Sequence, residues 1–217
     1  MKKSIVFFSI LSLLLCASIP VAALAAAGDD KAALTKENPL RVDTKEKSVT
    51  FLAEVNGKYL SLATRHGVVF SGGKFGEHAI FRGHVSPKDF YDALLKAGLK
   101  PGNNMTLENK EKTFVQGDLL EVTVTWADAK REYGIDEAII DSNGKPIQVR
   151  FGGNIQNALE YKTGCLLCLD SCPVGVTSNA SYTYGAVEKR NEVTFKANGK
   201  VLPPDGTLVM IKVKAKK

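Results

Sequence analysis

Short apolar stretches separated by tight-turn dipeptides limit the folds open to this chain more than any other feature. Asn56-Gly57 and Asn143-Gly144 are dipeptides favoured in hairpins, because both central positions of such turns need a positive φ. Asn198-Gly199 and residues 203–206 are further turn signals. Strands bounded in this way usually pair with their neighbours along the chain. The sequence therefore predicts a mainly β fold with antiparallel strands.

Alternation of apolar and polar residues marks the clearest strand, at residues 120–126. Its apolar residues are separated by Glu121, Thr123 and Thr125, which indicates one buried face and one solvated face. The two Asn-Gly dipeptides are expected to join residues 48–55 to 59–63 and residues 138–140 to 147–151 as hairpins. Further strands are expected at residues 40–42, 68–70, 79–81, 182–184, 192–196 and 208–213.

One substantial helix is predicted, at about residues 87–97. Ser86 can cap its free amides, and Pro87 suits the first helical turn. Gly98 follows the last turn, where a glycine commonly ends a helix. Four apolar residues fall on one face at helical spacing, as expected for core packing: Phe90, Ala93, Leu94 and Ala97. The predicted fold class is α+β, mainly β, with a C-terminal β-rich part that carries a cysteine loop.

The N-terminus has the pattern of an export signal. Lys2 and Lys3 precede an apolar stretch at residues 5–15, and the small-x-small sequence of residues 23–25 is typical of a cleavage site. The apolar stretch is too short for a membrane-spanning helix. The interpretation is a signal peptide at residues 1–25 without twin arginines, a periplasmic or secreted location, and no integral membrane segment after cleavage, with a retained anchor as the alternative.

Four segments follow from these patterns. Residues 1–25 are the signal peptide, residues 26–38 a flexible leader, residues 39–151 a β-rich domain, and residues 152–217 the cysteine loop with C-terminal strands. The net charge of +6 is mild for 217 residues, and its basic residues are scattered except near the C-terminal end. A solvated tail explains that end, so nucleic-acid binding is not predicted.

Three cysteines with the spacing C-x2-C-x3-C-P carry the strongest chemical signal. Cys165, Cys168 and Cys172 are close enough in sequence to reach one centre, and thiolates are soft ligands suited to iron–sulfur clusters, zinc or copper(I). The run ends in Pro173, as does a bacterial ferredoxin run, but Lys162 stands where the first ferredoxin cysteine would be. The three cysteines are therefore the predicted metal- and cofactor-binding residues.

The fourth ligand of such a centre is left open by the spacing. The alternatives are a histidine, Asp170, a water molecule or a residue of another subunit. The chain has three histidines, and of these His78 and His84 flank one predicted strand, with His66 nearby in sequence. A second site, if present, is expected to use His78 and His84.

An oxidising compartment favours other chemistry for the same cysteines. A disulfide among the three would leave one odd thiol, and a Cys165–Cys168 pair in a small strained ring would be suited to thiol–disulfide exchange.

Acidic residues after Trp126 are interpreted as a solvated face rather than a hydrolase pair: Asp128, Glu132, Asp136 and Glu137. No catalytic residue is predicted, and the interpretation favours a non-enzymatic protein.

Several stretches together resemble the YdjY-type exported proteins. They are residues 41–43, 76–79, 86–89, 93–102, 120–126 and 165–173. The resemblance implies that residues 39–151 form a YdjY-like domain, and that the cysteine loop is similar to that of four-iron ferredoxins. It implies an exported location but supplies no catalytic residues.

The predicted function is that of an exported metal-binding or iron–sulfur protein with an electron-transfer role and a redox protein as partner. The predicted cofactor is an iron–sulfur cluster, with zinc or no cofactor as alternatives. The alternative functions are an extracytoplasmic binding module with a disulfide in the cysteine loop, or a thiol–disulfide exchange protein.

Overall fold

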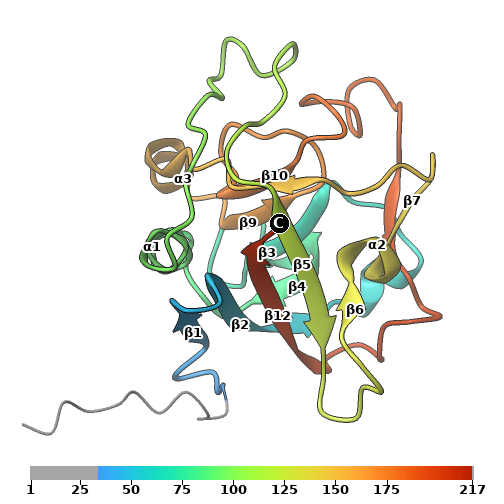
Figure 1. The fold of residues 1–217 in the computed structure, drawn as a ribbon. Helices are drawn as coiled ribbons and strands as arrows, with labels where there is room; N and C mark the ends of the chain where they lie inside the picture. The colour runs from blue at the N-terminus through green and yellow to red at the C-terminus, as the bar shows by residue number, and fades with distance from the viewer. Residues whose placement is uncertain (1–33, 217) are drawn as a thin grey trace, which may run out of the picture.

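The computed structural model describes residues 34–216, and Figure 1 shows their arrangement. The predicted signal peptide and residues 26–33 of the predicted leader lie outside the described residues. The elements in chain order are β1 (Leu40–Asp43), β2 (Ser48–Val55), η1 (Gly57–Leu60), β3 (His66–Phe70), η2 (Gly76–His78), β4 (Ala79–Gly83), α1 (Pro87–Lys96), β5 (Leu120–Thr125), β6 (Tyr133–Gly134), α2 (Ile135–Ala138), β7 (Ile139–Asp141), β8 (Val149–Arg150), α3 (Ile155–Tyr161), β9 (Cys165–Cys168), β10 (Thr177–Asn179), β11 (Phe195–Ala197) and β12 (Leu208–Ala215).

Most strands belong to one curled sheet of 10 strands in the order β6-β5-β12-β2-β4-β3-β9-β10-β8, with β1 paired to β2. The pairs β3–β4 and β9–β10 are parallel and the other pairs are antiparallel, so the sheet is mixed. Strands β7 and β11 form a separate pair. The prediction of a mainly β, α+β fold is confirmed.

The two ends of the curled sheet meet. An isolated bridge joins Leu119 to Arg150, and Arg150 Nη1 donates to the carbonyl of Gly117 at 2.8 Å. Gly117 has a φ of +107°, and a Cβ at this position would lie 2.1 Å from the carbonyl oxygen of Phe151. Only glycine permits this approach of the chain before β5 to the chain after β8.

Strands from both predicted parts of the chain share this sheet. Strand β12 lies between β2 and β5, and β9 pairs with β3 in antiparallel orientation. The cysteine-bearing segment is therefore hydrogen-bonded directly to strands from residues 39–151.

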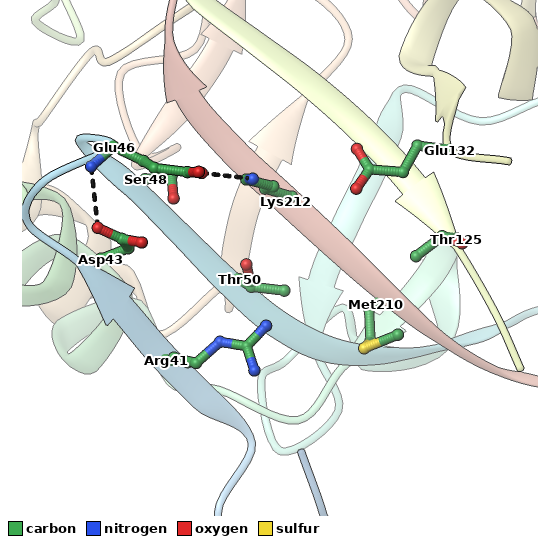
Figure 2. A pocket seen from close by; sticks show the side chains of 9 residues that line it. All are labelled: Arg41, Asp43, Glu46, Ser48, Thr50, Thr125, Glu132, Met210 and Lys212. Carbon is green, nitrogen blue, oxygen red and sulfur yellow. Dashed lines mark hydrogen bonds and ion pairs between the residues drawn. The ribbon is translucent and has the colours of Figure 1, made fainter. Parts of the chain in front are cut away.

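One face of the sheet carries a charged depression of ≈ 240 Å³, shown in Figure 2. It is crossed by an ion pair of 2.8 Å between Lys212 on β12 and Glu46. Asp43 accepts hydrogen bonds from the backbone of Lys45 and Glu46 at 2.9 Å. These charges stabilise the β1–β2 turn, and the depression contains no cysteine or histidine.

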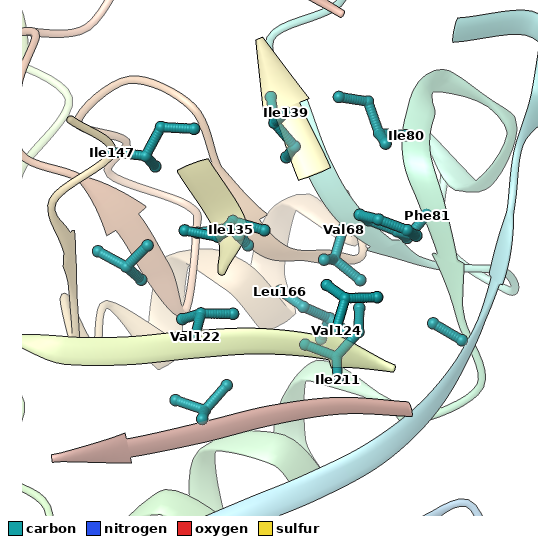
Figure 3. Packing of buried hydrophobic residues seen from close by; sticks show 14 of the residues in the cluster. Val68, Ile80, Phe81, Val122, Val124, Ile135, Ile139, Ile147, Leu166 and Ile211 are labelled. Atoms are coloured by element: carbon teal, nitrogen blue, oxygen red, sulfur yellow. The ribbon is translucent and has the colours of Figure 1, made fainter. Parts of the chain in front are cut away.

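The main core fills the inside of the curl (Figure 3). Val124 of β5 lies beside Ile211 of β12, Val122 lies further along β5, and strands β3, β4 and β9 contribute Val68, Phe81 and Leu166. Each such buried side chain contributes about 1.5–3 kcal/mol relative to an exposed one. This core holds the sheet that positions the cysteines.

The predicted helix is confirmed as α1. Ser86 Oγ accepts a hydrogen bond from the backbone N–H of Asp89 at 3.1 Å, and Pro87 is the first helical residue. Its apolar face is buried, and Phe90 meets the ring of Phe51 on β2 at a centroid distance of 5.0 Å. Helix α1 therefore covers the sheet at β2.

The two predicted hairpins are wrong. Asn56 has a φ of −100°, and residues 57–60 form η1, because Gly57 N–H donates to Asp205 Oδ1 at 2.7 Å. Gly144 does form a turn, with a φ of +68°, but the flanking strands β7 and β8 pair with β11 and β10.

The predicted strand at residues 182–184 is absent from the described structure, since Tyr182 turns inward to hydrogen-bond Asp141.

Strands β9 and β10 and helix α3 were not predicted from the sequence. Two of the three cysteines lie on β9 rather than in a loop. Between residues 34 and 216, none of the helices has the length and apolar character needed to cross a lipid bilayer.

Candidate functional site

Three segments bring the candidate ligands together. Strand β3 supplies His66, β9 supplies Cys165 and Cys168, and the loop after β9 supplies Cys172. In a regular strand, residues three apart point to opposite faces. The β3–β9 pairing has register shifts, and all three cysteines pack in one small cluster with Val69 and Ala79, apart from the main core. We call Cys165, Cys168 and Cys172 the cysteine cluster.

The ligand atoms of the site lie close to one another. Cys165 Sγ is 3.5 Å from His66 Nδ1, and the ligand atoms of His66, Cys165 and Cys168 all lie within 4.8 Å of one another. Cys172 is not among these convergent atoms, but it packs in the same cluster and its thiol interacts with that of Cys168. The exposed fractions of the three cysteines are 1%, 0% and 2%, and none of them forms a disulfide.

The pKa values of Cys165 and Cys168 are shifted in opposite directions. The hydrogen bond from Cys168, supported by His66, holds the pKa of Cys165 well below its ordinary value although burial acts the other way. The contacts with Cys165 and Cys172, together with burial, raise the pKa of Cys168. Of Cys165 and Cys168, Cys165 is therefore the more inclined to be a thiolate, which is the form that binds metals and attacks disulfides.

The backbone around the cysteine cluster is fixed by local contacts. A Cβ on Gly175 would lie 2.9 Å from Cys168 Sγ and 3.0 Å from Ser178 Oγ, so glycine is required there. Asn154 donates to the carbonyl of Cys172 at 3.2 Å, and Asn157 donates to that of Pro173 at 3.0 Å. These hydrogen bonds attach the loop of Cys172 to helix α3.

A buried ion pair lies behind the cluster. Arg65 Nη2 contacts Asp170 Oδ1 at 2.6 Å, and Gly185 N–H donates to the other carboxylate oxygen at 2.9 Å. Burial acts to lower the pKa of Arg65, but the charge of Asp170 reverses that effect and raises it. Burial also raises the pKa of Asp170 against the pull of Arg65. Both carboxylate oxygens accept from N–H groups, which is the arrangement of an ionised pair.

A cavity of ≈ 540 Å³ opens onto the cluster. Cys165 and Cys172 line it, whereas Cys168 lies behind them and does not. The imidazole of His66 stacks on the ring of Phe75 at a centroid distance of 5.4 Å, so an aromatic pair forms part of the wall. We call this space the cysteine cavity, and it gives small molecules a route to two of the three sulfurs.

The other residues considered as ligands are placed differently. His78 lines the cysteine cavity and packs edge-on against Phe75 at 5.8 Å, but it is not among the convergent ligand atoms. His84 lines a separate pocket with Glu37, and Asp170 is engaged by Arg65. Of the candidate fourth ligands, the structure brings His66 to the sulfurs.

The acidic residues after Trp126 have structural contacts. Glu137 pairs with Arg131 at 2.6 Å, and this hydrogen-bonded cation lowers the pKa of Glu137 to about 2. Asp136 accepts a hydrogen bond from the backbone of Ile147, and Glu132 accepts one from Thr123. They do not converge on a shared substrate position.

Arg65 and Tyr184 are site residues that the sequence did not reveal. The Arg65 guanidinium lies 4.3 Å from the ring centroid of Tyr184, and both line the cysteine cavity. Arg65 belongs to no recognisable sequence motif. Tyr184 lies in residues 182–184, whose composition predicts a strand rather than a binding site. Nothing local in the sequence distinguishes either residue from a surface position.

Known proteins share this sequence over nearly all of its described length. The family model described as "YdjY domain" matches residues 40–214. A protein of Escherichia coli (strain K12) named "Uncharacterized protein YdjY" is 54% identical over 181 residues, which cover 83% of this chain and 80% of that protein. No solved structure matches the chain. The family match includes the β3 histidine and the whole cysteine cluster, and the chain belongs to the YdjY family.

Proposed function

We propose that this protein binds a thiophilic metal centre through the sulfurs of Cys165, Cys168 and Cys172, with the imidazole of His66 as the nitrogen donor. The observation that carries the proposal is the convergence of the ligand atoms of His66, Cys165 and Cys168 in one buried group, with Cys172 packed in the same cluster. Buried sulfurs without disulfides, beside a polarising histidine, are typical of a metal site.

The spacing of the donor atoms suits one ion. Tetrahedral zinc has metal–sulfur bonds of about 2.3 Å and metal–nitrogen bonds of about 2.0–2.1 Å, so its ligand atoms lie roughly 3.5–3.8 Å apart. The distance of 3.5 Å between Cys165 Sγ and His66 Nδ1 falls in this range. An iron–sulfur cluster would hold its ligand atoms further apart than the 4.8 Å within which those of His66, Cys165 and Cys168 lie, because each ligand binds a different iron. Zinc or copper(I) is therefore the occupant that the donor set supports best.

We also propose that the protein is exported, because residues 1–25 have the pattern of a signal peptide. If the centre is an iron–sulfur cluster, as the C-x2-C-x3-C-P spacing suggests, electron transfer to a redox protein is its expected role. The visible spectrum separates the two cases, because zinc and copper(I) thiolates lack the broad visible absorption of iron–sulfur clusters.

Thiol–disulfide exchange is the second candidate. It is favoured by the lowered pKa of Cys165 beside the raised pKa of Cys168, since an exchange pair needs one reactive thiolate and one protected thiol. The burial of all three sulfurs, of which only those of Cys165 and Cys172 line the cysteine cavity, disfavours exchange with a protein disulfide. Only a small disulfide would reach Cys165.

Purification without oxygen tests the proposal. We expect about one thiophilic metal ion per chain by elemental analysis, and loss of stoichiometric metal in Cys168→Ser, because that sulfur joins the other two. Ala79→Ser is the matched control, since it adds a hydroxyl to the same cluster while keeping every sulfur.

Two outcomes would count against a metal centre. One is a folded protein that takes up no zinc, copper(I) or iron with sulfide when these are supplied. The other is full metal content in Cys168→Ser. Reversible titration of two thiols in a metal-free protein would instead support the exchange function.

A further inference from the structure

The cysteine cavity has the size of a ligand site. Its volume of ≈ 540 Å³ lies within the range of about 300–1,000 Å³ typical of pockets for small molecules. It is formed by β3, the loop before η2, the long segment between α1 and β5, and the segment after β10. Segments this far apart in sequence create a concave space that no single loop would enclose.

The walls of the cavity combine apolar and cationic groups. Phe75, Tyr161 and Val174 provide aromatic and aliphatic surface. Arg65 and Lys110 provide two cations. A single carboxylate among the lining residues belongs to Glu188, whose side chain is 65% exposed. This lining is suited to a molecule with an apolar body and a negative group.

Arg65 has donors that the protein itself does not use. A guanidinium carries five N–H groups in a fixed fork. Within residues 34–216, Arg65 makes one hydrogen bond, from Nη2 to Asp170, and its Nε has no partner. Its Nη1 lies 3.7 Å from Glu188, which is an ion-pair distance but too long for a hydrogen bond. Arg65 is almost fully buried but lines the cavity, and its Nη1, which faces Glu188, is the donor that an anion in the cavity would use.

Arg65 and Lys110 both lie near the aromatic ring of Tyr184. Lys110 Nζ lies 4.7 Å from the ring centroid of Tyr184, and Arg65 lies 4.3 Å from the same centroid. Asp170 fixes Arg65 from behind, so binding an anion requires little reordering of that side chain. Lys110 is less buried than Arg65 and can adjust to the ligand.

From these contacts we propose that the cysteine cavity binds a small organic carboxylate with an aromatic or apolar body. Its carboxylate pairs with Arg65 Nη1 and Lys110, and its body packs against Phe75 and Tyr161. Bound there, the molecule lies next to Cys165 and His66. The proposal does not depend on a metal, because none of these contacts involves one.

Binding of 1-naphthoate, measured by calorimetry at low ionic strength, tests the proposal on both metal-free and metal-loaded protein. We expect naphthoate to bind and its neutral amide, 1-naphthamide, to bind at least several-fold more weakly. In Lys110→Gln we expect a loss of about two- to fivefold in naphthoate affinity, as for one partly exposed charge pair. In Glu188→Gln we expect a gain of similar size, because the competing carboxylate is removed.

Lys112→Gln is the matched control, since Lys112 belongs to the same segment but does not line the cavity. The proposal is overturned if naphthoate does not bind at millimolar concentration. It is also overturned if the amide binds equally well, or if the Lys110 and Glu188 variants both behave like the control. Failure of the metal centre would leave all these expectations unchanged, so the two proposals are tested separately.

Discussion

Among single residues, Arg65 and Asp170 connect the cysteine segment to the rest of the site. The pair is almost completely excluded from solvent, and Asp170 also accepts the backbone N–H of Gly185. The loop of Cys172, strand β3 and the segment of Tyr184 are therefore tied to one another through one carboxylate. A buried pair of this kind costs desolvation energy but fixes the relative position of the elements it joins.

Asp170→Ala is expected to destabilise the protein by about 3–5 kcal/mol, because it leaves the charge of Arg65 buried without a counter-ion. Urea denaturation of the metal-free protein measures the change. Glu188→Gln removes the exposed partner of the same guanidinium and is expected to change stability by less than about 0.5 kcal/mol. Equal effects of the two substitutions would contradict the assignment of Asp170 as the buried counter-ion.

Residue types predicted part of the site and not the rest. Cys165, Cys168 and Cys172 stand out by spacing, because cysteines close in sequence cannot be far apart in space. The spacing did not distinguish His66 as the histidine beside the cysteines, because its position depends on the pairing of β3 with β9. Arg65 became recognisable only through a partner 105 residues away.

Among the elements, α1 shows how well local signals predict a boundary. Its cap, first-turn proline and terminal glycine all act within a few residues, so the local sequence is enough to predict where the helix begins and ends. Strand β9 shows the opposite case. Its residues are buried on both faces, and its assignment depends on partners β3 and β10 from distant parts of the chain. The failed hairpin at Asn56-Gly57 has the same cause, since Asp205 decides the conformation.

Ser86→Ala is expected to lower stability by about 1 kcal/mol, because the N–H of Asp89 loses its acceptor at the start of α1. Thermal and urea unfolding give the change. Thr113→Ala serves as the control, since this hydroxyl makes no hydrogen bond within residues 34–216 and its loss should be nearly neutral. A Ser86 variant as stable as the control would show that α1 is held by packing alone.

For the whole molecule, closure of the curled sheet is the property that local patterns predict least. Fold class followed from composition and alternation, but strand order depends on pairings between residues more than a hundred positions apart. The closure also depends on backbone contacts at Gly117 that have no side-chain signature.

Gly117→Ala tests the closure. Its Cβ would collide with the carbonyl oxygen of Phe151 at a backbone position that also disfavours side chains. We expect a loss of stability about 2–3 kcal/mol larger than in Gly144→Ala, where φ is also positive but no atom lies within 4 Å of the new Cβ. Chemical denaturation of both variants compares a positive-φ position that has the collision with one that does not. Similar losses would mean that the two ends of the sheet separate at little cost.

The central position of β12 also sets when the molecule can be completed. This strand pairs with β2 on one side and β5 on the other, although it follows them by more than eighty residues. A nascent polypeptide emerging from the ribosome lacks the strand between β2 and β5 until residue 215 has been made. Until then β2 and β5 lack the strand that joins them, so we expect the complete sheet to form only after synthesis of the chain has ended.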